Sequence, residues 1–348
     1  MLRHCILQAI KPTRPAPAAA TTATALTQPE MALLREWMNQ QNEWIPLWVH
    51  SSMKTWKAVR IARRGGGTIT ITVISPSVRG ADPEDTVAVR YVRAHMYPVV
   101  SKAYGAVASY MALHNRAHNR APGHNVVDMH AVYIAHPRKR VLPDSDKVIL
   151  PVHINGGFSV FGQRSPANQP WRVVVYRTED ATKVMLHEMM HLLHLDGDQV
   201  SESVETAWAR RHFVFLAPPT RRLSIREAVA ETLACFVYAV AASSSAAAAR
   251  GACARMGHRI DAIAADLLAR APPFADGTHA FAYAIARAAL WDGENGACDE
   301  LLRIVESGST DDVLALLDVR IPALAQRLKI LGSSRPPKRR VGLGLVEF

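Results

Sequence analysis

Two histidines four residues apart, with a glutamate directly after the first, are the residues of this sequence best suited to chemistry: His187-Glu188-Met189-Met190-His191. On a helix, side chains four apart share one face, so both imidazoles can reach one ion. Zinc accepts imidazole nitrogens at about 2.0–2.1 Å and retains a water molecule when the protein supplies only three ligands. Glu188 is then suited to remove a proton from that water. The pattern predicts a zinc site with His187 and His191 as ligands and Glu188 as catalytic base.

A third ligand is expected from Glu227 or Glu231, which lie four residues apart in a segment that should be helical from Ser224 to about Ala242. In the gluzincin arrangement of zinc peptidases, a glutamate of a second helix completes the metal site. We therefore favour Glu227 as ligand, with Glu231 hydrogen-bonded to a ligand histidine to fix its tautomer. Two alternatives stay open: Glu231 binds the metal, or Glu227 only caps its own helix with Ser224.

Other polar residues near the pattern are weaker candidates. His194 shares a face with the two histidines, but on a straight helix it lies a turn beyond reach of the same ion. Asp196 or Asp198 can instead brace a ligand histidine. A peptidase also needs a donor for the developing oxyanion. Three residues remain open for that role: His212, His279 and Tyr283.

The helix that bears the histidines should begin at Thr178, a good N-cap, and run to about His194, with Gly197 near its end. A long helix is expected over 83–118, with a kink or break at Pro98. We interpret Gly156-Gly157 as a turn. Period-2 alternation and β-branched residues predict strands. The expected strands are 56–62, 68–74, 126–135, 148–154, 158–161 and 172–177.

This order of elements indicates an α+β fold in which a mixed sheet is backed by one helix and a second helix provides the metal ligands. The part after about residue 241 is rich in alanine and should be helical. The expected organisation is a disordered leader over 1–30, a metallopeptidase domain over 31–240, a helical subdomain over 241–331 and a basic flexible tail over 332–348.

The composition limits the class of protein. Hydrophobic residues make up 49% and charged residues 20% of the chain, which is ordinary for a soluble globular protein. The net charge of +11 suggests that the protein has a basic surface to which an acidic partner binds. Basic residues form small clusters at Arg138-Lys139-Arg140 and Lys338-Arg339-Arg340. The four cysteines form no CxxC pair, which favours a reducing, intracellular location over a secreted one. No segment suits a membrane span, and prolines in the leader disfavour a mitochondrial transit peptide.

Five segments in and around these motifs carry a resemblance to a known family. They are Asn155-Gly156-Gly157-Phe158, Val174-Val175-Tyr176-Arg177, Lys183-Val184-Met185-Leu186-His187-Glu188, Leu195-Asp196 and Glu227-Ala228-Val229-Ala230-Glu231. Together they resemble the predicted gluzincin-type metallopeptidases of large DNA viruses. In those proteins a strand ending in tyrosine and arginine precedes the HExxH helix, and a later helix bears two glutamates. The likeness covers about residues 85–240, and its HExxH core is the specific part. His194 departs from it, since glycine is common there.

The resemblance implies a zincin fold, a zinc ligand at Glu227 and hydrolysis of a peptide or protein substrate. A different class of function stays open: a catalytically inactive zincin-fold protein that binds a protein or nucleic acid. Glu188 discriminates between them, because a purely structural zinc site needs no base and is normally closed by four protein ligands. Cleavage preference, endo- or exopeptidase action and oligomeric state are not specified by the sequence.

Overall fold

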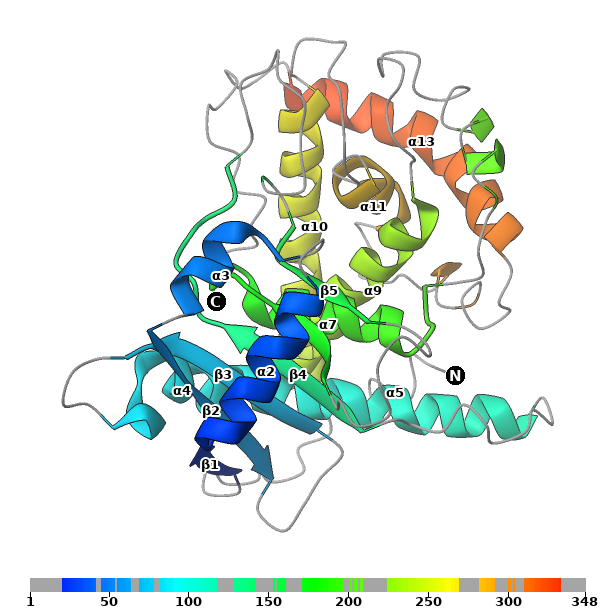
Figure 1. Cartoon of the computed structure of the whole chain (residues 1–348). Coiled ribbons are helices and arrows are strands. Elements are labelled where there is room, and N and C mark those ends of the chain that lie inside the picture. Colours follow the sequence, from blue (N-terminus) through cyan, green and yellow to red (C-terminus); the bar gives the residue numbers. More distant parts are fainter. Residues whose placement is uncertain are drawn as a thin grey trace. The chain divides into compact units, whose positions relative to one another are not determined.

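The computed structural model describes residues 21–41, 45–53, 55–63, 69–77, 82–117, 128–141, 153, 155–160, 171–196, 201, 203–205, 207–208, 224–268, 282–291, 300–301, 303 and 310–332 (Figure 1). Its contacts divide the chain into two compact units. The sheet unit comprises Lys11–Lys139 and Gly156–Leu193, and the helical unit comprises Met1–Ile10, Arg140–Asn155 and His194–Phe348. The fold is α+β.

A mixed six-stranded sheet forms the centre of the sheet unit. Its strands are β1 (Thr21–Ala25), β2 (Trp56–Arg63), β3 (Ile69–Pro76), β4 (Met129–Ile134), β5 (Gly157–Ser159) and β6 (Trp171–Val175). Their order is β1-β2-β3-β4-β6-β5 (Figure 1). Strands β3, β4 and β6 are parallel, whereas β1, β2 and β5 run antiparallel to their neighbours. The mixed sheet that the sequence predicts is confirmed.

One face of this sheet is covered by the helices α2 (Gln28–Gln40) and α3 (Leu47–Met53). Side chains alternate between the two faces of a strand, so one row across the sheet shares a face. The row Thr72, Val132, Val174 and Phe158 follows from the strand register. Three of these residues belong to one apolar cluster with Leu34 and Trp37 of α2 and Val49 of α3.

The other face carries the row Val73, Tyr133, Val175 and Gly157. It packs against α4 (Val87–Tyr91) and α7 (Ala181–Leu192). The ring of Tyr91 in α4 lies 6.3 Å from the ring of Tyr133. The hydroxyl of Tyr91 is 2.9 Å from that of Thr182, which ties α4 to α7.

The long helix predicted over 83–118 is interrupted. The structure has a 3-10 turn η2 (Pro83–Asp85), α4, a π-helical turn η3 (Val92–Met96) and α5 (Tyr97–Ala117). The predicted break at Pro98 is confirmed, because the π turn ends just before this proline. A proline ring has no N–H and clashes with the carbonyl of the preceding turn, so the helix must widen there.

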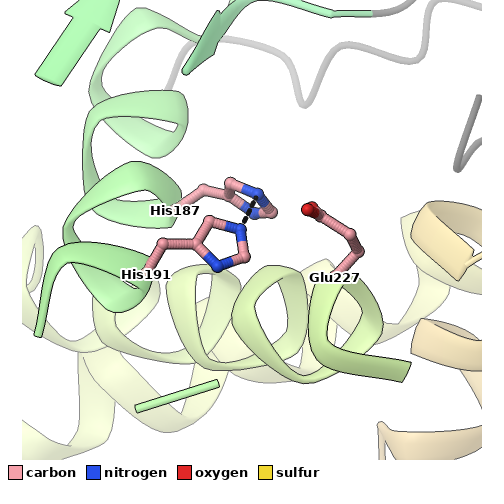
Figure 2. A group of neighbouring side chains, drawn as sticks. All are labelled: His187, His191 and Glu227. Atoms are coloured by element: carbon pink, nitrogen blue, oxygen red, sulfur yellow. Dashed lines mark hydrogen bonds between the residues drawn. The ribbon is translucent and has the colours of Figure 1, made fainter. Parts of the chain in front are cut away.

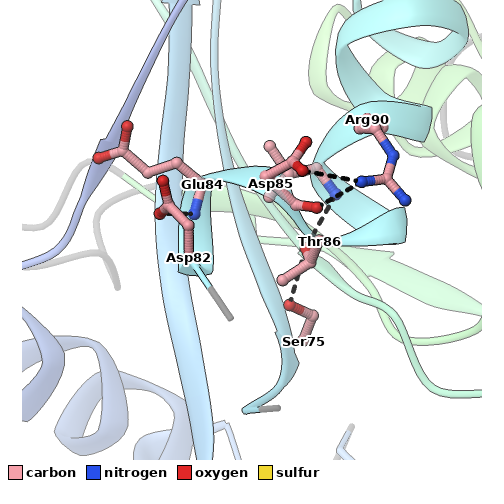
Figure 3. A network of polar contacts seen from close by, with 7 residues as sticks. Ser75, Asp82, Glu84, Asp85, Thr86 and Arg90 are labelled. Carbon is pink, nitrogen blue, oxygen red and sulfur yellow. Dashed lines mark hydrogen bonds and ion pairs between the residues drawn. The ribbon is translucent and has the colours of Figure 1, made fainter. Parts of the chain in front are cut away.

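A polar network fixes the start of α4 at the end of β3 (Figure 3). The hydroxyl of Thr86 accepts the N–H of Val89, capping α4, and lies 3.3 Å from the hydroxyl of Ser75 at the end of β3. Arg90 donates to the carbonyl of Asp85 at 2.7 Å. Asp82 caps η2 by accepting the N–H of Glu84 at 2.8 Å. These local contacts fix the conformation of the chain between β3 and α4.

Two predictions about the sheet unit need correction. Strand β1 lies inside the segment 1–30 that was expected to be a disordered leader. Its backbone pairs with β2 from Thr21 opposite Arg63 to Ala25 opposite Val59, so order begins by residue 21. Gly157 is also not in a turn: it is the first residue of β5. The expected strand 148–154 falls mostly outside the described residues, as does residue 161 of the strand expected over 158–161.

The helical unit contains α9 (Ile225–Ala241), α10 (Ala246–Leu268), the π turn η5 (Ala282–Ala286), α11 (Arg287–Leu290) and α13 (Thr310–Gly332). The expected helix over 224–242 and the helical character of the alanine-rich part are confirmed. Helix α9 packs against α10 and α11, and α10 packs against α13. These contacts group α9 with the helices after residue 241. The predicted organisation instead assigned α9 to the domain over 31–240 and those helices to a separate subdomain over 241–331.

Across the described helices, none is both long and apolar enough to cross a membrane.

Candidate metal centre

Helix α7, which bears the two histidines, begins and ends at other residues than predicted. Its N-cap is Asp180, with φ 55°, and not Thr178. The N–H of Thr178 donates to the carbonyl of His136 at 3.0 Å, so Thr178 is bound to the end of β4 instead. The helix ends at Leu192, with His194 in the left-handed region at φ 53°. His194 therefore terminates the helix, and Gly197 lies outside the described residues.

Burial holds α7 in place. All twelve of its residues are buried, including both histidines and Glu188. A helix that is buried all round belongs to the centre of a protein, so its orientation is fixed by packing on every side. It packs against β5 and β6 of the sheet and against α5. The apolar side chains of this segment are buried, among them Val184, Leu186, Met190 and Leu193.

The imidazoles of His187 and His191 meet edge to face, with ring centroids 4.7 Å apart and ring planes at 79°. Their Nε2 atoms are 3.0 Å apart, and the two residues are only 5% and 6% exposed. Two nitrogens at about 2.0–2.1 Å from one tetrahedral ion would be about 3.3–3.4 Å apart. The pair is therefore within a few tenths of an ångström of the spacing that a shared zinc ion requires.

Glu188 lies against the edge strand β5 at Gly157. A Cβ atom added to Gly157 would lie 3.4 Å from Cγ of Glu188, 2.9 Å from Cγ1 of Val184 and 2.5 Å from the carbonyl oxygen of Val174. Contacts below 3.0 Å cannot be accommodated without movement, so only glycine allows β5 to approach α7 this closely. The backbone of β5 thereby supports the stem of the predicted catalytic base.

Glu227 is positioned by the first turn of α9. Ser224 caps this helix by accepting the N–H of Glu227 at 3.3 Å. The N–H of Ile225 donates to the carboxylate of Glu205 at 2.8 Å. Two of the four N–H groups that a helix start leaves unpaired are thus bound. Ser224 therefore caps α9, as in the alternative that pairs it with Glu227 in a capping box.

Three buried or half-buried side chains form a group that could hold a metal ion: His187, His191 and Glu227 (Figure 2). One nitrogen of each histidine and one carboxylate oxygen of Glu227 all lie within 4.8 Å of one another. Two neutral imidazoles and one carboxylate are a common zinc donor set in hydrolytic enzymes. The carboxylate also offsets part of the charge of a divalent cation. The donor set therefore fits zinc.

Glu231, predicted to brace a ligand histidine, forms a buried ion pair. Its carboxylate accepts a hydrogen bond from Arg287 at 2.6 Å, and the side chains are 4% and 3% exposed. The same nitrogen of Arg287 is 3.9 Å from the thiol of Cys235. Arg287 was not a sequence candidate, and nothing local marks it, since 56 residues separate it from Glu231. The bracing role of Glu231 remains a prediction.

Asp196, the other predicted brace, is also paired with an arginine. Its carboxylate, 1% exposed, accepts from Nε of Arg226 at 2.8 Å and from Nη2 of the same side chain. Arg226 is the residue next to Glu227, so this contact ties the chain just after α7 to the start of α9. His194 is exposed, unlike the two buried histidines. The structure thus separates His194 from them in environment.

The sequence offers three candidate oxyanion donors. His212 and His279 lie outside the described residues, as does the side chain of Tyr283, and Asp198 lies outside as well. Within the described residues, two imidazoles, a carboxylate and a neighbouring glutamate can hold a divalent cation and exchange a proton beside it.

Comparisons with protein-family models, with curated proteins and with solved structures found no match for this chain.

Proposed function

We propose that the chain is a zinc-dependent metallopeptidase with a zincin-like fold. His187 and His191 bind the ion, Glu227 is its third protein ligand and Glu188 is the general base. The observation that supports this best is the buried pair of Nε2 atoms 3.0 Å apart on one helix face. The resemblance to the gluzincin-type metallopeptidases of large DNA viruses agrees with this proposal and rests on the sequence motifs alone.

A zinc ion bound here would supply Lewis-acid polarisation to a water molecule and to a substrate carbonyl. The protein's own residues do the rest. Glu188 accepts the proton of the attacking water and passes it to the leaving amine as the peptide bond breaks. The absence of a side chain at Gly157 leaves room for the stem of Glu188 next to β5.

Burial sharpens this chemistry. His187, Glu188 and His191 are each at most 7% exposed. In a site from which water is mostly excluded, interactions between charges are stronger than at the surface.

The test is to measure zinc content and peptide hydrolysis in purified wild type and in three variants. Glu188→Gln should retain zinc and lose hydrolysis by about 10²–10⁴-fold, since it removes only the general base. His187→Ala should lose both zinc and hydrolysis, because two remaining ligands hold the ion poorly. His194→Ala, at the exposed end of the same helix, is the matched control and should change neither.

Hydrolysis that survives Glu188→Gln unchanged would refute the role of Glu188. Wild-type protein that binds zinc but cleaves no peptide in a broad peptide library would instead favour the non-catalytic binding module. Protein that binds no zinc would refute both.

A further inference from the structure

A second polar cluster lies in the sheet unit, directly after β4, where the parallel strands end. The segment His136–Lys139 is held by the main chain and by one buried arginine. Arg177, fully buried, donates to the carbonyls of Arg138 and Lys139 at 3.0 and 2.9 Å. The carbonyl of His136 accepts the N–H of Thr178 at 3.0 Å. The backbone of this segment is therefore fixed, while the side chains of Arg138 and Lys139 are exposed.

The indole ring of Trp48 makes cation–π contacts with two arginines of this cluster. The guanidinium carbons of Arg138 and Arg177 each lie 5.3 Å from the ring centroid of Trp48. The ring centroid of His136 lies 4.3 Å from that of Trp48 and 5.8 Å from that of Trp56. Stacking on an aromatic face restrains a guanidinium without using its N–H groups. The contact with Trp48 therefore restrains Arg138 and does not itself use the hydrogen-bond donors of its guanidinium.

The cluster has an excess of positive charge. Among the ion pairs of the described residues, none joins Arg138 or Lys139 to a carboxylate.

Burial and the nearby guanidinium groups of Arg138 and Arg177 lower the pKa of His136. Its ring is therefore neutral at pH 7. Nδ1 of His136 accepts the N–H of Arg138 at 3.1 Å, which assigns the ring proton to Nε2. The imidazole is thus another donor.

We infer that His136, Arg138 and Lys139 form a binding site for the phosphate group of a small ligand. A guanidinium, an ammonium and an imidazole N–H supply donors and about two positive charges, which match a doubly charged group with three oxygens better than a carboxylate. The site lies at the carboxyl ends of the parallel strands β3, β4 and β6, where open sheets with parallel strands commonly bind ligands. This inference does not depend on the metal centre or on peptidase activity.

Calorimetric titration of the full chain with inorganic pyrophosphate, at constant ionic strength, tests the site. Saturable binding with a dissociation constant of roughly millimolar or tighter is expected for two or three charge-assisted hydrogen bonds. Arg138→Ala should weaken binding about tenfold or more, and Lys139→Ala somewhat less. Arg138→Lys retains the charge but loses the planar donor pair, so its affinity should lie between wild type and Arg138→Ala.

Arg90→Ala is the matched control, because it removes one exposed arginine of the same unit that is already paired with Asp85. It should leave pyrophosphate binding unchanged. Equal weakening by Arg90→Ala and Arg138→Ala would reduce the effect to net charge and overturn the site. So would equal binding of acetate, absence of saturable heat, or single-stranded DNA that binds through Arg138 while pyrophosphate does not.

Discussion

The helices α2 and α7 of the sheet unit begin in opposite ways. Helix α2 has a capping box, in which Glu30 accepts the N–H and the hydroxyl of Thr27, both at 2.8 Å. Helix α7 begins at Asp180, in the left-handed region at φ 55° and without a side-chain cap. One helix start follows a local sequence rule, and the other breaks it.

Burial explains the difference. Only four of the thirteen residues of α2 are buried, whereas all twelve residues of α7 are. An exposed helix gains most from its own capping groups, while a central helix is stabilised by the surfaces that surround it. The helix that bears His187 and His191, the two proposed metal ligands, is therefore specified by packing, and its ends are set by the chain before and after it.

The largest expected effect comes from breaking the packing of α7 against β5. Gly157→Ala adds a methyl group that would lie 2.9 Å from Val184 and 2.5 Å from a carbonyl of the sheet. Overpacking of this kind costs about 1–3 kcal/mol. Gly105→Ala in α5 is the control, since its added Cβ meets nothing within 4 Å, and it should stabilise by about 0.5–1 kcal/mol. Denaturant unfolding measures both, and a stabilised Gly157→Ala would contradict the close approach.

A smaller effect is expected at the other end of α7. His194→Gly relieves a non-glycine residue at φ 53°, a conformation that costs about 1–2 kcal/mol for residues with a side chain. We expect a gain of about 1 kcal/mol in unfolding free energy, read as a higher Tm. Zinc content should stay at the wild-type value, because the exposed His194 is not a proposed ligand. Loss of zinc in this variant would show that His194 takes part in metal binding.

The smallest expected effect concerns the start of α2. The N–H of Thr27, the Arg60 side chain and the Thr27 hydroxyl lower the pKa of Glu30 from 4.5 to about 2. A lowered pKa contributes stability that is present above pH 4.5 and is lost as the pH falls toward about 2. Wild type should therefore be more stable than Glu30→Gln at pH 7, by a margin that shrinks between these values. Glu36→Gln, exposed on the same helix, controls for net charge.

If the difference in unfolding free energy between wild type and Glu30→Gln stays constant from pH 7 to pH 2, the carboxylate charge of Glu30 does not stabilise the start of α2.

The sequence predicts well the parts of the fold that depend on local spacing. Alternation in Thr-Ile-Thr-Ile-Thr-Val placed β3, and the i, i+4 rule placed the two histidines on one face of a helix. The expected start of a helix at Ser224 also agrees with the structure, in which the Ser224 hydroxyl caps α9 by accepting the N–H of Glu227 three positions on. These features need no knowledge of distant parts of the chain.

The features that sequence reasoning missed depend on long-range contacts. Thr178 has the right type for a cap, but its N–H and its hydroxyl both donate to the carbonyl of His136, two residues after β4. The short strand β1 pairs with β2, about 40 residues later in the chain. Arg287 reaches Glu231 across 56 residues. None of these partners leaves a periodic signal in the sequence.

X-ray absorption at the zinc edge, on protein loaded with one equivalent of zinc, is the sharpest test of the proposed metal site. We expect two imidazole nitrogens at about 2.0–2.1 Å, further light-atom oxygen scattering from a carboxylate and solvent, and no sulfur. His191→Ala should remove one imidazole contribution. Zinc bound through sulfur, or a spectrum unchanged by His191→Ala, would contradict it.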